Sequence, residues 1–262
     1  MDDWKSQPLT AFLSNVGGAV VSLNTVVVGL DAVENGHNKP DGLNISWAPT
    51  DKRAAARKAR KFVVEAVLVR IFEALFEHTR TLASLCQFDG IKSVWDGKTS
   101  RATKIWEIYR YVVGENHLVA AAVLVCHWRN KIVHPESGAK LTPAQKNLLR
   151  RDEAEIAEKY KNLSVDCLLC HFDEGRPTLK DVSVLIAMTI NLVRAADVAT
   201  ASTLSKEDFD RWLAHYKLVE VIEKVRRETK PDDLHRSICR VFQTKAPKML
   251  SAYEHYYPTG AV

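Results

Sequence analysis

The chain has 262 residues, of which 46% are hydrophobic, and its 37 basic against 32 acidic residues give a net charge of +5. This content is ample for a buried core, so we expect a fold that does not depend on disulfides. The odd number of cysteines, five, also argues against a disulfide framework and is typical of reduced thiols inside a cell. The mild basic excess suits a polyanionic partner without requiring one.

The first residues carry no export signal, since Met1-Asp2-Asp3-Trp4 is acidic and no small-residue cleavage site follows an apolar region. Residues 16–33 are apolar enough to raise the question of a membrane span. Asn24, Asp31 and two glycines interrupt them, so we expect a buried helix there. These features predict a cytoplasmic protein with no membrane association.

Apolar periodicity and cap residues predict an all-α chain. Residues 8–33 are expected to form one helix or two short elements, followed by a turn-rich loop over 34–42. A long helix is expected over 52–85, with Thr50 or Asp51 as its cap. Its core-facing stripe is predicted at Phe62, Val63, Ala66, Val69, Phe72 and Phe76.

The second half of the chain is expected to alternate helices with two loops. The loops are predicted near residues 89–97 and over 164–177, where turn residues gather. Ser205 to Asp208 is predicted to form a capping box. Helices are expected over 103–113, 143–162, 179–203, 205–227 and 231–253, and Gly114 is expected to separate the first of them from a central helix that ends at His134.

The most informative stretch is Arg129-Asn130-Lys131-Ile132-Val133-His134-Pro135, which follows an unbroken apolar run at 118–126. A helix without a polar face is expected to be buried on all sides. Pro135 disfavours helical geometry at His134, so the helix should end there, where its polar side chains leave the core. Asn130 and His134 are four apart and would share a face, and Arg129 has the reach to join them. All three are expected to contact one phosphate.

Each residue type suits phosphoryl chemistry. Arg129 offers a planar donor fork that matches phosphate oxygens. His134 can take and give a proton near neutral pH, and Asn130 can orient the imidazole or a ribose hydroxyl. The alternative interpretation is that arginine and histidine simply complement the dipole at a helix C-terminus.

The pattern Arg129-Asn130-x3-His134, which closes an apolar helix in an all-helical chain, resembles the signature of the HEPN superfamily over about residues 50–200. The resemblance implies a helical bundle with additional N- and C-terminal helices, and a homodimer whose two motifs face one cleft. It also implies a metal-independent endoribonuclease that needs no cofactor, in a toxin–antitoxin or anti-phage module with a possible antitoxin or regulatory partner. Glu136 stands where HEPN toxins silenced by adenylylation carry a tyrosine, so that control is not expected.

Basic residues gather at the start of the long helix. The interpretation as an RNA-binding track competes with that of a solvated helix face. The cluster comprises Lys52, Arg53, Arg57, Lys58, Arg60 and Lys61.

Cys167, Cys170, His235 and Cys239 form a weaker alternative, a zinc site, since the first pair has finger-like spacing and the second lies one helical turn apart. Cys167-x2-Cys170-His171 also fits the pattern of haem attachment, which normally follows export.

We therefore expect an N-terminal extension at 1–49, a HEPN-like core at 50–204 and a C-terminal helical extension at 205–262. The main functional alternative is a HEPN-like protein that binds a nucleotide or RNA without cutting it, or acts as an adaptor. A third possibility is a zinc-stabilised structural protein.

Overall fold

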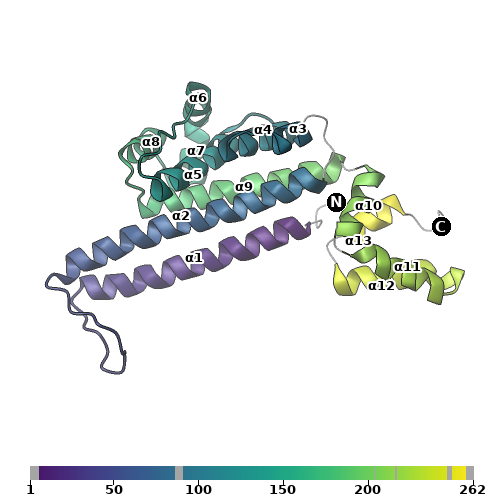
Figure 1. The fold of residues 1–262 in the computed structure, drawn as a ribbon, viewed down its shortest axis with the longest axis horizontal. Coiled ribbons are helices and arrows are strands. Elements are labelled where there is room, and N and C mark those ends of the chain that lie inside the picture. Colours follow the sequence, from purple (N-terminus) through teal and green to yellow (C-terminus); the bar gives the residue numbers. More distant parts are fainter. Residues whose placement is uncertain (1–5, 86–90, 204, 216, 247–249, 258–262) are drawn as a thin grey trace. The chain divides into compact units, whose positions relative to one another are not determined.

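The computed structural model describes residues 6–85, 91–203, 205–215, 217–246 and 250–257. These residues form thirteen helices and no strand, so the predicted all-α fold is confirmed (Figure 1). The chain divides into two compact units. The first, the α5 unit, comprises Leu13–Leu75 and Asn116–Ile190; the second, the α12 unit, comprises Met1–Phe12, Phe76–Glu115 and Asn191–Val262.

The α5 unit is built around α5 (His117–Val133), in which every residue from 119 to 126 is buried. The prediction of a helix buried on all sides is confirmed, because a segment with no polar face is stable only when other elements surround it. The unit also holds α6 (Pro143–Arg151), α7 (Glu153–Lys159) and α8 (Val165–Glu174). Parts of three long helices complete it: α1 (Gln7–Glu34), α2 (Lys52–Leu85) and α9 (Leu179–Thr203).

Two predicted boundaries in this unit are wrong. The helix expected over 143–162 is divided at Asp152, which ends α6 with φ −99° and ψ 17°. Residues expected in a loop form α8, because Ser164 caps its first turn and Gly175 closes it in the left-handed region at φ 69°. The cap residues of this short helix are themselves turn formers, which is why the segment resembled a loop.

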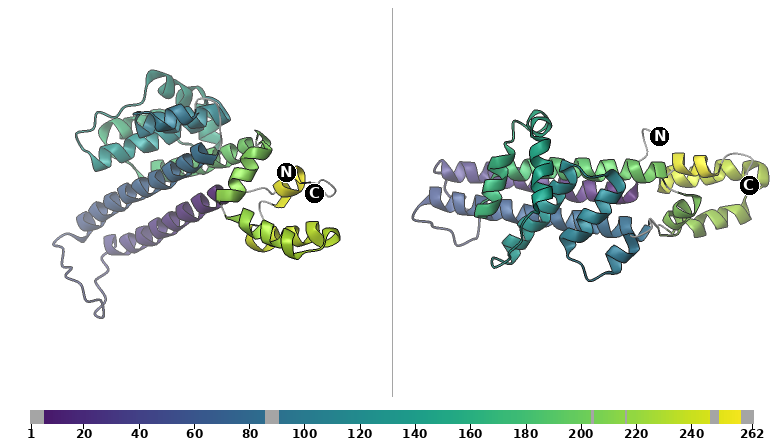
Figure 2. Two further views of the ribbon diagram at one scale, coloured as in Figure 1. Left: turned by 45° about the vertical axis from the view of Figure 1, so that its right-hand side comes forward. Right: turned by 90° about the horizontal axis from the view of Figure 1, so that it is seen from above.

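The α12 unit contains α3 (Ile91–Asp96) and α4 (Arg101–Val113), so the loop expected near 89–97 holds a short helix. Its C-terminal part folds as α10 (Lys206–His215), α11 (Leu218–Glu228), α12 (Pro231–Lys245) and α13 (Leu250–Tyr256), where the sequence predicted two helices. The predicted cap holds, since Ser205 and Asp208 bond each other reciprocally. Both views of Figure 2 show α11 beside α12. The shared core comprises Phe209, Trp212, Leu213, Leu218, Ile222, Ile238, Phe242 and Tyr253.

The face of α2 that is buried differs from the predicted stripe. Phe72 is fully buried, but Phe62 is 70% exposed. The prediction selected a neighbouring face of the helix because Phe62 and Phe76 stand at the two ends of the predicted stripe. The buried face has a spacing of four and three residues and includes Val64, Leu68, Ile71, Leu75, His78 and Leu82.

The expectation that residues 16–33 form a buried helix is also wrong. They belong to α1, whose most apolar stretch has a mean hydropathy of 1.7 but only 11% of its residues buried. Val21 and Val28 are 66% and 71% exposed. Both α1 and α9 are long and apolar enough to cross a membrane by length and composition alone, although 56% of the corresponding stretch of α9 is buried.

One side of α1 packs along α2 in the α5 unit (Figures 1 and 2). Arg70 of α2 donates to the Asn15 side chain over 3.5 Å, and Arg60 pairs with Glu34 over 3.0 Å. The apolar composition of α1 therefore exceeds what its contact face uses, and Val21, Val26 and Val28 remain exposed.

Candidate active site

Local signals define both ends of α5, the helix that carries the predicted motif. The Asn116 side chain accepts hydrogen bonds from the backbone N–H groups of Leu118 and Val119, at 2.9 and 3.2 Å. At the other end, His134 has φ −129° and ψ 85°, outside the helical region, because Pro135 follows it. The predicted helix end at His134 is confirmed.

Arg129 and Asn130 lie together at this end. Nη1 of Arg129 donates to Oδ1 of Asn130 over 3.4 Å, and the guanidinium lies 5.4 Å from the centre of the Phe72 ring. Nη2 lies 3.7 Å from Oε1 of Glu73 on α2. The arginine side chain is 17% exposed, and its Nε is buried with no hydrogen-bond partner among the described residues. The arginine is therefore held in place with unused donor capacity.

His134 is exposed, and its backbone N–H donates to the Asn130 carbonyl over 2.8 Å. Among the described residues, no contact joins its imidazole to Arg129 or Asn130. The predicted stacking of His134 over Asn130 is not formed, because that stacking needs helical geometry and the residue before proline is extended. The structure thus brings two of the three motif residues together and leaves the third exposed beside them.

The end of α5 has a positive environment that the sequence did not reveal. Nζ of Lys131 donates to the Phe172 carbonyl at the C-terminus of α8 over 2.7 Å and lies 4.1 Å from the centre of the Phe172 ring. Burial lowers the pKa of Lys131, and the nearby charges of Lys140 and Lys146 lower it further, against the opposing effect of Asp173. Asp173, which pairs with Lys146 over 3.6 Å, therefore partly offsets the positive charge of these lysines.

The neighbours of Arg129 on α5 belong to the core. Trp128 is fully buried and packs edge-on against Phe172 at 5.3 Å between ring centres, so it is a packing residue. His127 lies at the core edge, and its buried Nδ1 has no hydrogen-bond partner within the described part of the chain. Burial, and secondarily Lys131, lowers the pKa of His127.

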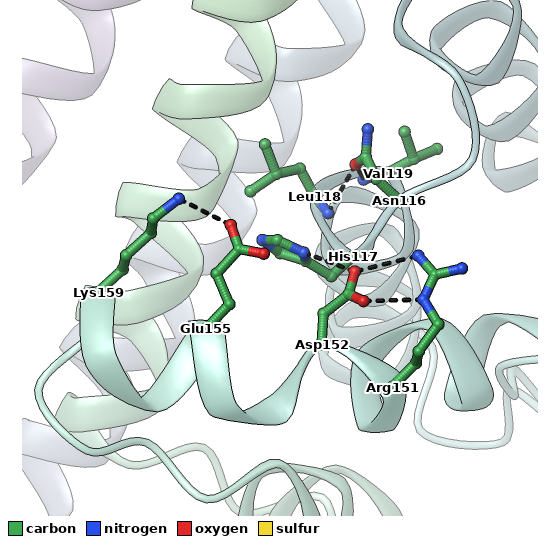
Figure 3. Close-up of polar contacts among 8 residues, drawn as sticks. All are labelled: Asn116, His117, Leu118, Val119, Arg151, Asp152, Glu155 and Lys159. Carbon is green, nitrogen blue, oxygen red and sulfur yellow. Dashed lines mark hydrogen bonds and ion pairs between the residues drawn. The ribbon is translucent and has the colours of Figure 1, made fainter.

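A polar network anchors the first turn of α5 (Figure 3). Nδ1 of His117 lies 2.9 Å from Oδ2 of Asp152, and Nε of Arg151 donates to Oδ1 of the same carboxylate over 2.8 Å. The hydrogen bond from Arg151, opposed by burial and assisted by His117, holds the pKa of Asp152 at about 2, below the ordinary 3.8. The sequence did not single out this network, which fixes α5 against the junction of α6 and α7.

Replacing Asp152 by Asn is expected to lower the free energy of unfolding at pH 7 by about 1–2 kcal/mol, because a depressed pKa is stabilisation of the charged form. Because the folded pKa lies below the unfolded one, this stabilisation is present above pH 4 and disappears as the pH falls toward 2. Urea unfolding of both proteins between pH 3 and pH 7 measures it.

The matched control is Asp166→Asn, since Asp166 pairs with Arg150 over 3.0 Å but is 69% exposed. An exposed pair is worth about 0–1 kcal/mol, so this variant should change stability less. Equal losses in the two variants, or a pH-independent loss at Asp152, would contradict the assignment.

The predicted basic cluster lies elsewhere on α2. Lys61, its last member, precedes Glu73 by roughly 18 Å along the helix axis at about 1.5 Å per residue. Several members are engaged locally, and the role in RNA binding stays a prediction. Arg57 and Arg60 pair with Glu34, Lys61 with Glu65, and Lys52 donates to Gly36 and Asn38, while Arg53 and Lys58 are exposed.

The four residues of the predicted zinc alternative occupy two helices. Cys167 and Cys170 lie exposed on α8, and His235 and Cys239 lie on α12. Within the described residues, the group of metal-type ligands that the structure forms contains the second pair with Glu254 and neither residue of the first. His171, the third residue of the haem-like pattern, is bonded through Nδ1 to the buried Asp181 over 2.8 Å.

Further polar residues follow on the same helix, α2, namely Glu73, Glu77, His78 and Arg80. Of these, Glu73 contacts Arg129. His78 is instead a core residue of the α12 unit, bonded to the hydroxyl of Tyr109 over 2.7 Å, and burial lowers its pKa to about 4.

The chain matches no protein-family model, no curated protein and no solved structure.

Proposed function

We propose that the chain is a metal-independent endoribonuclease of the HEPN type. It would act as a cytoplasmic homodimer in a toxin–antitoxin or anti-phage module, under the control of an antitoxin or another regulatory protein. The observation that carries the proposal is the arrangement at the end of α5. There Arg129 and Asn130 are already bonded to each other, and the exposed His134 follows where the helix stops.

In the proposed reaction the substrate supplies the nucleophile. His134 takes the proton from the ribose 2′-hydroxyl, O2′ attacks phosphorus, and the bond from phosphorus to O5′ breaks. His134 of the second protomer returns a proton to the leaving O5′. Arg129 stabilises the negative charge on the phosphate oxygens, and Asn130 keeps the guanidinium in place. The products are a 2′,3′-cyclic phosphate and a 5′-hydroxyl end.

Substrate type and product ends test this proposal. An RNA oligonucleotide should be cut in excess chelator, with circular dichroism confirming that the chelator leaves the protein folded. The DNA of the same sequence should remain intact, because it lacks the attacking hydroxyl. One 2′-O-methyl group at the main cleavage position should block that cut alone. Cleavage of DNA, or a product with a 3′-hydroxyl, would reject the mechanism.

Oε1 of Glu73 lies 3.7 Å from Nη2 of Arg129. An RNA phosphate that binds Nη2 must therefore displace the Glu73 carboxylate. Glu73 is 48% exposed, so solvent reaches the pair and its separation costs little.

Replacing Glu73 by Gln is expected to strengthen RNA binding by about three- to tenfold, since it removes a competing anion worth about 1 kcal/mol. Filter binding or fluorescence anisotropy at fixed salt measures the change. The control is Glu77→Gln, which makes the same charge change on the same helix and removes a pair with Arg80. If both variants bind RNA equally well, the gain is a general charge effect, and Glu73 has no special position.

The alternative is a HEPN-like protein that binds RNA or a nucleotide at this place without cutting it, or serves as an adaptor. The ion pair of Arg129 with Glu73 and the unengaged imidazole of His134 favour this alternative. Binding that Arg129→Ala weakens, together with an absence of cleavage under all conditions, would support it over the enzyme.

A further inference from the structure

A second group of reactive side chains lies in the α12 unit and shares no residue with the proposed active site. His235 and Cys239 stand one turn apart on α12, and Glu254 reaches them from α13. Nε2 of His235 lies 3.5 Å from Sγ of Cys239, and Sγ lies 3.9 Å from Oε1 of Glu254. One nitrogen, one sulfur and one oxygen thus converge, all within 4.8 Å of one another.

These separations suit a tetrahedral metal ion. With zinc bonds of about 2.05 Å to nitrogen and about 2.3 Å to sulfur, two ligand atoms at the tetrahedral angle stand about 3.5 Å apart. The distance from His235 to Cys239 has this value, and that from Cys239 to Glu254 exceeds it by a few tenths of an ångström. Small side-chain rotations would therefore suffice to bind an ion.

Hydrogen bonds alone satisfy this group poorly. The Cys239 thiol has one proton to share between the Glu254 carboxylate and the His235 nitrogen that face it. Nδ1 of His235 is buried with no hydrogen-bond partner among the described residues, so no bond fixes its tautomer, and Nε2 can present a lone pair. The ring stacks against Tyr253, with ring centres 6.1 Å apart. Tyr253 therefore holds the imidazole in position, and Nε2 faces the Cys239 sulfur.

We propose that His235, Cys239 and Glu254 bind one divalent transition-metal ion of the zinc type, with water as the fourth ligand. The thiol proton leaves when the bond from sulfur to the metal forms. A ligand set of nitrogen, sulfur and oxygen selects zinc or cobalt and disfavours magnesium and calcium, which require oxygen ligands. The exposed Glu254 leaves one side of the ion to solvent. The ion would join α13 to α12.

Titration of the full, untagged chain with Co²⁺ tests the site, because a cobalt–thiolate bond produces a charge-transfer absorption band. We expect one Co²⁺ per chain, the thiolate band, and displacement of cobalt by Zn²⁺. Zn²⁺ should also slow alkylation of Cys239, followed by mass spectrometry, and leave that of the exposed Cys170 unchanged. Each of His235→Ala, Cys239→Ser and Glu254→Gln should weaken Co²⁺ binding by about tenfold or more.

Two control variants show whether a loss of Co²⁺ binding is specific to the proposed ligands. His255→Ala removes an imidazole next to Glu254 that lies outside the group, and Cys170→Ser removes another thiol, so both should bind Co²⁺ like the wild type. Circular dichroism shows whether each variant is folded. Binding without the thiolate band, binding abolished by Cys170→Ser, or full binding by folded Cys239→Ser would overturn the proposal. None of these measurements depends on RNA cleavage. The proposed metal site can therefore be confirmed even if the proposed ribonuclease activity is rejected.

Discussion

His134→Ala and Arg129→Ala are each expected to lower the rate of RNA cleavage by about 100-fold or more, the usual effect of losing an acid–base or charge-stabilising group. The two variants should differ in binding. Arg129→Ala deletes a phosphate contact and should weaken RNA affinity and its salt dependence, whereas His134→Ala should leave affinity nearly unchanged. Single-turnover cleavage and equilibrium binding, measured on the same RNA in excess chelator, separate these effects.

Matched controls are available on the surface. Arg176 has a side chain that is 77% exposed, and His37 is exposed in the connector between α1 and α2. Arg176→Ala and His37→Ala should cleave RNA like the wild type. If folded, dimeric His134→Ala retains full activity, His134 is not the acid–base group and the proposed chemistry is wrong.

Trp128→Ala is expected to lower the free energy of unfolding by about 3–5 kcal/mol, the range observed when a large buried aromatic side chain is deleted. The indole is fully buried, and its contact with Phe172 joins α5 to α8. Urea denaturation followed by circular dichroism measures the loss.

Phe62→Ala serves as the control, because this aromatic residue is 70% exposed and its removal leaves no cavity. Its effect should lie within about 0.5 kcal/mol of the wild type, as for most surface substitutions. A loss below 1 kcal/mol for Trp128→Ala would mean that the interior around α5 is loosely packed.

Features set by neighbouring residues were predictable from the sequence. The end of α5 at His134 and the bounds of α2 depend on a proline, on caps and on periodicity, all visible locally. Contacts between distant residues were not predictable. The carboxylate of Asp152 contacts His117, which lies 35 positions earlier in the sequence. No rule of residue spacing predicts such a pair.

In the candidate sites, too, local features were predictable from the sequence and contacts between distant residues were not. The sequence identified Arg129 and Asn130 as neighbours, but it placed His134 over them because it assumed helical geometry up to the proline. It paired His235 and Cys239 with two cysteines of familiar spacing. Glu254 enters the group instead because α13 packs against α12, and this depends on tertiary structure.

The exposed face of α1 has a thermodynamic consequence. Val21 and Val28 lie seven residues apart, hence on one side of the helix, and both remain in water. Covering each 100 Å² of such apolar surface releases about 2.5 kcal/mol. A second molecule that bound this face would bind only the folded chain, so by mass action its binding would add to the free energy of unfolding. In that case the melting temperature of the chain would depend on the concentration of the bound molecule as well as on the amino-acid sequence.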